Sequence, residues 1–480
     1  MNGTKETKRT DRLLALIREG RPMTLRQQLQ LTACLSVPAI LAQVSSIAMQ
    51  YVDASMVGRL GAGAAASIGL VSTTTWLFGG VCSAAATGFS VQVAHRIGAD
   101  DFKGARQVLR QSFAAMLAFG LLLALVGAAI SGSLPAWLGG DASIRDDASA
   151  YFLIFSLFLP VLQISFLAGG MLRCSGNMRV PSMLNVLMCV LDVVFNYFLI
   201  FPSHSFGIAG VEVTVPGAGL GVVGAALGTV LAELITAGLM VWYLCRRSPR
   251  LRLAHESGRY RPAALTLRRA ARISLPMGLE HIAICSAQIM ITAIVAPLGV
   301  FAIAANAFAI IAESLCYMPG YGIAEAATTL VGQSVGAGRR DLVRRFAGIT
   351  VGAGMAVMGL MGLLLYVAAP QIIGVMTPVE EIRELGAAVL RIEAFAEPMF
   401  AASIVAYGVF VGAGSTLVPC LMNFLSIWGV RLVLAACLAP VMGLRGVWLA
   451  MCVELCFRGA IFLARLWRGR WIDQLQPKTT

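Results

Sequence analysis

Long apolar segments, separated by short polar or charged stretches, run along almost the whole chain. Each is about 20 residues or longer, the length that an α-helix needs to cross the hydrocarbon core of a bilayer. The pattern predicts an all-α membrane protein with twelve transmembrane helices. The predicted helices cover residues 31–57, 64–95, 107–131, 148–172, 181–201, 220–245, 268–296, 302–335, 342–369, 384–412, 418–440 and 444–466.

The second half of this pattern repeats the first. A shift of 238 residues aligns residues 36–185 with residues 274–423 without a gap. Because the repeated unit is almost entirely apolar, it predicts two homologous six-helix bundles related by a pseudo-two-fold axis along the membrane normal, as in many carriers. Matched pairs include Pro38 with Pro276, Gly98 with Gly336, Pro160 with Pro398 and Asn185 with Asn423.

The register changes after the fifth predicted helix, because Gly221 and Gly224 match Gly443 and Gly446 at a shift of 222. We place the extra residues of the first half at 202–219. The predicted organisation is then a cytoplasmic N-terminal tail, a first bundle, a basic cytoplasmic linker, a second bundle and a cytoplasmic C-terminal tail, at residues 1–30, 31–246, 247–267, 268–468 and 469–480. Residues 1–22 are polar, and we expect them to form a loose tail.

Composition agrees with a membrane protein: 58% of the residues are hydrophobic, 13% are charged, and the mean hydropathy is +0.79. Twelve spans leave no room among 480 residues for a separate soluble catalytic domain. The eleven cysteines show no CxxC or Cys/His ligand spacing, and most fall in apolar spans. We therefore interpret them as packing residues and expect no cofactor.

The distribution of Lys and Arg predicts the orientation, because cytoplasmic loops retain positive charge. With both termini in the cytoplasm, 31 of the 37 basic residues are assigned to that side, the last five from Arg458 to Lys478, and only Arg431 is assigned to the membrane interior. The net charge of +13 is thus spread over every inner loop. This argues against a nucleic-acid partner and for a multi-pass protein of the plasma (inner) membrane that contacts lipid.

Acidic residues inside the predicted spans carry the candidate chemistry. A charged side chain in the bilayer is costly unless it is paired, hydrated or protonated. Basic partners at the same depth are nearly absent, since only Arg431 and His281 are candidates. Unpaired carboxylates there are expected to exchange protons or to hold a cation, as in a cation-coupled carrier. The acids are Asp53, Asp192, Glu233, Glu280, Glu313, Glu325, Glu393, Glu397 and Glu454.

Two positions in the first half stand out. Asp53 lies near the end of the first predicted helix and is either a functional acid or a cap near Gly58. Asp192 lies near mid-membrane, with Asn196 one turn later on the same face. A carboxylate with an amide oxygen either binds a small cation or proton, or forms a buried packing site.

The second half offers secondary candidates for coupling or substrate binding. Glu393 and Glu397 lie one turn apart before Pro398, where like charges repel unless one is protonated or a cation lies between them; Glu393 could instead lie near the outer surface. Glu280 with His281 is either a proton site or a structural contact. Glu233 and Glu454 are near-equivalent in the repeat, which favours a shared structural role.

Residues 30–468 resemble the multidrug and toxic compound extrusion (MATE) family. Four motifs, in this order within a duplicated twelve-helix chain, carry the resemblance. The first closes the first predicted helix, the next two follow the eighth and the tenth, and the last lies in the eleventh. They are residues 52–61 (VDASMVGRLG), 332–338 (GQSVGAG), 412–416 (GAGST) and 428–431 (WGVR).

The resemblance implies a secondary active antiporter that exports organic, mainly cationic and amphipathic, compounds in exchange for H⁺ or Na⁺ by alternating access between two bundles. It implies a cation site, and with it a possible Na⁺ position, at Asp53, Asp192, Asn196 and Thr229. It implies no enzymatic activity, and we expect a monomer. In the family the amide usually precedes the acid on the fifth helix, whereas here Asp192 precedes Asn196.

The second bundle departs from the family's sodium-driven members, which carry acids on the seventh and tenth helices. By our alignment Ile284 and Phe400 occupy those places, which favours protons as the coupling ion. A lipid or lipid-linked precursor flippase of a related fold is the alternative, but it would need several basic residues in its cavity. A membrane-embedded enzyme would need a nucleophile, a metal or paired histidines, and a channel would not need paired homologous bundles.

Overall fold

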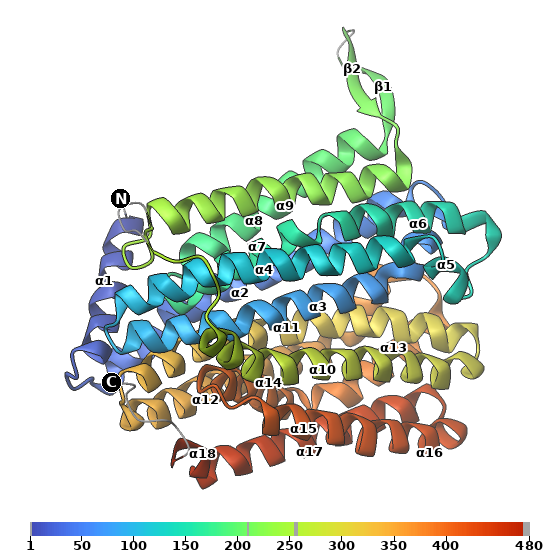
Figure 1. Ribbon diagram of the computed structural model, residues 1–480. Coiled ribbons are helices and arrows are strands. Elements are labelled where there is room, and N and C mark those ends of the chain that lie inside the picture. Colours follow the sequence, from blue (N-terminus) through green and yellow to red (C-terminus); the bar gives the residue numbers. More distant parts are fainter. Residues whose placement is uncertain (1, 209–210, 254–257, 474–480) are drawn as a thin grey trace.

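The computed structural model describes residues 2–208, 211–253 and 258–473. Long helices run side by side, both chain ends lie at one end of the bundle, and a β-hairpin projects from the opposite end (Figure 1). We refer to these as the terminal end and the hairpin end. The predicted all-α membrane architecture is confirmed.

The helices follow the predicted duplicated order. The first bundle contains α2 (Leu25–Gly58), α3 (Ala62–Gly98), α4 (Phe102–Ser131), α5 (Leu134–Trp137), α6 (Ala142–Leu157), α7 (Leu159–Cys174), α8 (Arg179–Ile200) and α9 (Gly221–Arg246). The second contains α10 (Ala264–Val295), η1 (Ala296–Leu298), α11 (Val300–Gly336), α12 (Arg340–Met376), α13 (Glu380–Ala394), α14 (Glu397–Gly412), α15 (Leu417–Ser426), the π-helical segment η2 (Ile427–Arg431), α16 (Leu432–Met442) and α17 (Leu444–Arg468).

Two of the predicted spans are bent. In the described residues, ten helices are long and apolar enough to cross a membrane alone, and the pairs α6–α7 and α13–α14 bring the number to twelve. These pairs bend by 48° and 58°. Pro160 and Pro398 lie in the first turn of α7 and α14. Proline removes a backbone donor and clashes with the preceding turn, and because the two prolines match in the repeat, so do the bends.

The insertion expected at residues 202–219 is the β-hairpin. Strands β1 (Pro202–Ile208) and β2 (Val211–Ala218) pair antiparallel, with Gly207 opposite Glu212. These strands were not predicted from the sequence, because the alternation of polar and apolar residues extends over too few positions. The hairpin joins α8 to α9 and makes the first bundle longer than the second at the hairpin end (Figure 1).

The expectation of a loose N-terminal tail was wrong. Residues Asn2–Arg18 form α1, which lies across the terminal end (Figure 1). Leu13, Leu14 and Ile17 share one face of this helix and are buried, with 7%, 0% and 0% of their surface exposed. Burial of this apolar face accounts for the ordered helix. After α17, the short helix α18 (Arg470–Asp473) packs Trp471 and Ile472 into the same core.

The interface between the bundles follows the sequence repeat. It is formed mainly where α2 meets α11 and where α3 meets α10 and α11. His95 Nε2 donates to the Gly412 carbonyl at 2.8 Å, and Gln333 Nε2 donates to the Cys174 carbonyl at 2.9 Å. The shift of 238 residues converts one of these bonds into the other. The pseudo-two-fold axis therefore passes through the terminal end of the molecule.

Two glycines allow this close approach. A Cβ on Gly98 would lie 2.0 Å from the carbonyl oxygen of Gln333, and a Cβ on Gly336 would lie 1.9 Å from that of His95. These glycines also match at the shift of 238. Any larger side chain at either position would push the two bundles apart at the terminal end.

Candidate functional site

A cluster of two carboxyl groups and one amide lies in the first bundle. Asn196 Nδ2 donates to Asp53 Oδ1 at 3.0 Å and to Asp192 Oδ2 at 3.1 Å. Asp53 comes from α2, and the other two from successive turns of α8. Asp192 and Asn196 are buried, with 0% and 1% of their surface exposed. The amide bridges both acids although it follows the acid along the helix, because residues four apart share one helix face.

The two carboxyl groups also contact each other. Asp53 and Asp192 lie close enough for a hydrogen bond between their side chains. Two carboxylates offer only acceptors, so this bond needs a proton on one of them. Since Asp53 contacts α8, it is not a cap of the α2 end.

Helix α9 closes the cluster. A Cβ on Gly228 would lie 2.0 Å from Asn196 Oδ1, so only glycine allows α9 to approach this closely. The Thr229 hydroxyl donates to the Ala225 carbonyl at 3.2 Å and also lies beside Asp192. Asp192 Oδ1 and Asn196 Oδ1 are buried and have no hydrogen-bond partner among the described residues. The structure thus brings together all four residues implied by the family resemblance.

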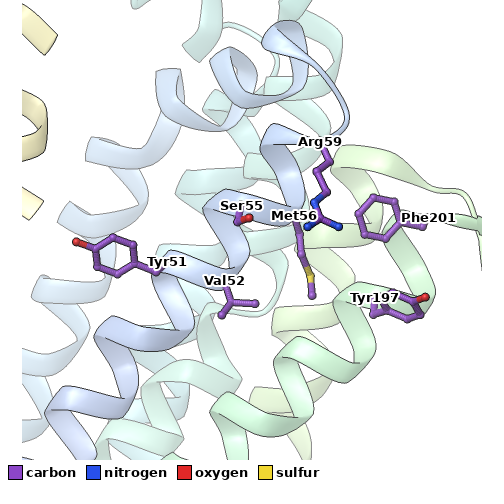
Figure 2. A pocket seen from close by; sticks show the side chains of 7 residues that line it. All are labelled: Tyr51, Val52, Ser55, Met56, Arg59, Tyr197 and Phe201. Carbon is purple, nitrogen blue, oxygen red and sulfur yellow. The ribbon is translucent and has the colours of Figure 1, made fainter. Parts of the chain in front are cut away.

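A pocket lies next to the cluster on the hairpin side. It has a volume of about 270 Å³ and lies between α2 and α8. In Figure 2, Met56 of α2 and Arg59 just after it face Tyr197 of α8 and Phe201 just after that helix, while Tyr51 points to the other side of α2. The three bridged residues do not line the pocket, which therefore lies beside the cluster.

Glu280 and His281 are not a pair in the structure. Glu280 points into the second bundle, where Tyr407 Oη donates to its Oε2 at 2.6 Å and Asn423 Nδ2 donates to its Oε1. His281 points to the first bundle, where its ring lies 4.8 Å from that of Trp76. Adjacent residues on a helix point about 100° apart, which explains the separation.

Glu393 and Glu397 flank the bend between α13 and α14. Both have 0% of their surface exposed, which excludes a position of Glu393 at the outer surface. Their carboxyl oxygens have no hydrogen-bond partner among the described residues apart from a contact of Glu397 with Cys316. Glu313 of α11 lies close to both. Three acids buried together favour protonated carboxyl groups.

Glu454 is paired, which corrects the expectation that basic partners are nearly absent. It forms ion pairs with Arg431 at 2.7 Å and with Arg458 at 3.1 Å, and it accepts a hydrogen bond from Ser426 at 2.6 Å. Arg458 was expected in the cytoplasm but is buried within α17, four residues after Glu454. This spacing is the sequence signal that could have revealed the pair.

The other two intramembrane acids have ordinary polar neighbours. Glu325 lies 3.7 Å from Arg173 across the bundle interface and accepts a hydrogen bond from Gln43 at 3.3 Å. Glu233 lies beside Ser165. Among the residues that the structure describes, no group of three or more His, Cys, Asp or Glu side chains is placed to hold a metal ion. A single monovalent cation at the amide-bridged cluster remains compatible with its oxygen atoms.

Comparison with known proteins gives a consistent result. The MatE family model matches residues 38–198 and 276–437, which are the two halves of the repeat. A "Probable multidrug resistance protein NorM" of Thermotoga maritima is 25% identical over 91% of this chain and 92% of its own length. "Multidrug resistance protein PmpM" of Pseudomonas aeruginosa is 25% identical over 95% of both chains.

Solved structures share the fold. A MATE protein in complex with MaL6 superposes with a TM-score of 0.85 at 20% identity and covers 93% of this chain and 97% of its own. The outward-facing conformation of a multidrug resistance MATE family transporter of the MOP superfamily gives a TM-score of 0.84 at 19% identity, with 94% and 97% covered. At these identities the likeness concerns the fold.

Proposed function

Because this chain belongs to the multidrug and toxic compound extrusion (MATE) family, a family of transporters and not of enzymes, we propose that it is an antiporter that exports organic, mainly cationic and amphipathic compounds in exchange for protons. Its relatives are named multidrug resistance proteins. The transporter works by alternating access, with the two bundles as the moving parts. It acts as a monomer in the inner membrane.

The observation that carries this proposal is the amide-bridged cluster of Asp53, Asp192 and Asn196. Neither acid has an ion pair with a basic side chain in the part of the chain that the structure describes, and Asp192 is fully buried. Two ionised carboxylates at this depth would repel strongly, whereas one proton neutralises one of them and supplies the missing donor. Proton uptake at the cluster and binding of a cationic substrate thus compete for the same negative charge.

The contacts between the bundles support an assignment of the conformation. The hydrogen bonds described between them lie in the terminal half of the molecule, and the Trp76–His281 contact lies near the middle of α10. With both termini in the cytoplasm, as the charge distribution predicts, this arrangement is outward-facing. Residues 31–246 and 268–468 are then the two moving bundles, joined by the linker at 247–267.

We assign the acids of the second bundle a secondary role in coupling. Glu393 and Glu397 are buried at a helix bend and can change their environment if α14 moves relative to α13. Glu280 is already held by Tyr407 and Asn423. Sodium is the alternative ion at the first-bundle cluster, because the free oxygens of Asp192 and Asn196 could coordinate it.

The ion pairs of Glu454 argue against the flippase alternative. Arg431 and Arg458 are the basic residues expected to hold an anionic headgroup within the second bundle. Both are neutralised by Glu454, at 2.7 and 3.1 Å. A lipid pyrophosphate would have to break these buried ion pairs to bind there.

Transport into vesicles under imposed proton or sodium gradients tests the proposal. Asp53→Asn and Asp192→Asn should abolish proton-driven transport of organic cations, because an amide side chain does not take up or release a proton at physiological pH. Asp147→Asn, which changes an exposed acid near the hairpin end, is the matched control. Full proton-driven export by both cluster variants at normal protein levels would refute the assignment of the cluster. Transport driven only by a sodium gradient would show that sodium and not the proton is the coupling ion.

A further inference from the structure

Helix α1 bridges the two bundles at the terminal end. It contacts α2 and α3 of the first bundle and α11 of the second. Its buried residues Leu13, Leu14 and Ile17 belong to one core cluster whose other members come mostly from the second bundle, among them Leu330 and Phe346. Separation of the bundles at this end would therefore expose apolar surface on α1 to water.

Polar contacts hold the same segment at both sides. Arg18 lies 3.7 Å from Asp100 in the turn between α3 and α4 of the first bundle. On the other side, Arg339 in the turn between α11 and α12 of the second bundle donates to the Arg21 carbonyl at 2.8 Å. The segment from α1 to Arg21 is thus fastened to a turn in each bundle.

The linker between the bundles takes part as well. Arg250 donates to Asp11 of α1 at 2.8 Å and to the Ser175 carbonyl at the end of α7. Helix α1 therefore contacts the linker as well as both bundles.

The helix covers one of the two symmetry-related contacts of the interface. The position of a Cβ on Gly176, two residues after Cys174, lies 2.2 Å from Leu14 Cδ1 and 3.5 Å from Gln333 Nε2. At the symmetry-related Gly414, the corresponding neighbours are His95 and Ile273, and no residue of α1 is within 4 Å. One half of an otherwise symmetric interface is therefore covered by an added element outside the repeat.

We propose that α1 is a strap that holds the terminal end closed and must detach from one bundle before that end can open. The strap sets the balance between the two access states, because it adds contacts that exist only when the terminal ends of the bundles are together. A protein with a weakened strap should open at the terminal end more often.

Distances between spin labels test the strap. Labels at Lys103 and Arg345, exposed positions at the terminal ends of the first and second bundle, report the opening; they are attached through unnatural amino acids so that the native cysteines stay unchanged. In the variant Leu14→Gln/Ile17→Gln, we expect the ratio of separated to closed terminal ends to rise roughly tenfold or more. Arg12→Gln, on the exposed face of the same helix, should leave the ratio unchanged.

A second label pair shows whether α1 itself has moved. Labels at Arg12 and Arg345 should give a broad distance distribution in the double variant and a narrow one in the labelled protein that keeps Leu14 and Ile17. If α1 detaches while the Lys103–Arg345 distances stay those of the unchanged protein, α1 is not a strap. If α1 stays bound with two glutamines at buried positions, its apolar face does not hold it, and the proposal is equally overturned.

Two precautions keep the test decisive. If the glutamine variant does not fold, Leu14→Ala/Ile17→Ala should produce a smaller rise in the same direction. The inference rests on the alternating access of the proposed function, but the distances are measured without substrate or ion gradient. Unchanged distances would refute the strap and leave export intact, whereas loss of export in Asp53→Asn would say nothing about the strap.

Discussion

Gly228→Ala should uncouple the transporter without unfolding it. The added Cβ would lie 2.0 Å from Asn196 Oδ1 and 3.0 Å from Asn196 Cγ. The amide is the end of a rotatable side chain and can turn away, whereas the Asn196 backbone nitrogen, 3.0 Å from the added Cβ, requires α9 to move away from α8 by only a few tenths of an ångström. Turning away, however, removes the donor that bridges Asp53 and Asp192 at 3.0 and 3.1 Å.

The size of the effect follows from these two bonds. A hydrogen bond to a charged group is worth about 1.5–3 kcal/mol, so losing one of them lowers the population of the bridged geometry roughly 10- to 100-fold. We expect proton-driven transport to fall by about the same factor. The melting temperature should change little, because alanine is the better helix former by about 1 kcal/mol and offsets part of the strain.

The matched control is Gly238→Ala on the same helix, where an added Cβ meets no atom within 4 Å. Both variants are purified, compared by thermal unfolding, and placed in vesicles for uptake of an organic cation under an imposed proton gradient. The reasoning is refuted if Gly228→Ala transports like Gly238→Ala with the same dependence on external pH.

Three further predictions concern other parts of the molecule. Glu454→Gln leaves the buried Arg458 and the half-buried Arg431 without a counter-charge, so thermal unfolding should show a loss of about 3–5 kcal/mol in stability. Glu380→Gln, in an exposed pair with Arg383, should be nearly neutral. Gly98→Ala pushes a Cβ to 2.0 Å from the Gln333 carbonyl and should favour separated terminal ends in the spin-label measurement, unlike Gly348→Ala, whose Cβ meets nothing. His95→Gln should preserve the bond to Gly412, as Gln333 does at the equivalent position, whereas His95→Leu should increase opening; equal behaviour of the two would show that this bond does not hold the interface.

Hydrophobic periodicity and the internal repeat were sufficient to predict the fold. Bilayer thickness fixes the length of a span, and a duplicated apolar unit has few ways to pack, so the twelve spans and two bundles followed from the sequence. The bends at Phe158 and at Phe395–Ala396 were not predicted, although Pro160 and Pro398 marked them. Helix α1 was missed because its apolar stripe is only five residues long and lies in a polar segment.

The candidate site was predicted in part, and the differences have a geometric cause. Asp192 and Asn196 were recognised because spacing of four places them on one helix face, but their contact with Asp53 depends on how α2 packs against α8. The other predicted pairs were wrong or missed because the direction of a side chain around the helix axis determines its partners. Glu280 and His281 are neighbours in sequence yet face different bundles, and Arg458 faces Glu454 instead of the cytoplasm.

The repeat itself provides an argument that the first-bundle acids serve function and not folding. At the shift of 238, Asp53 and Asn196 correspond to Ile291 and Leu434, which both pack against one apolar cluster of the second bundle. At the shift of 222, Gly228 corresponds to Ala450, a buried member of that cluster. A homologous bundle is therefore stable with hydrocarbon at these places, although its helix contains the π-helical segment η2 where α8 is α-helical. The fold does not need these acids, yet the first bundle keeps them although burying charged groups is costly. Gly228, which makes room for the Asn196 amide, likewise occurs only in the bundle that has the amide.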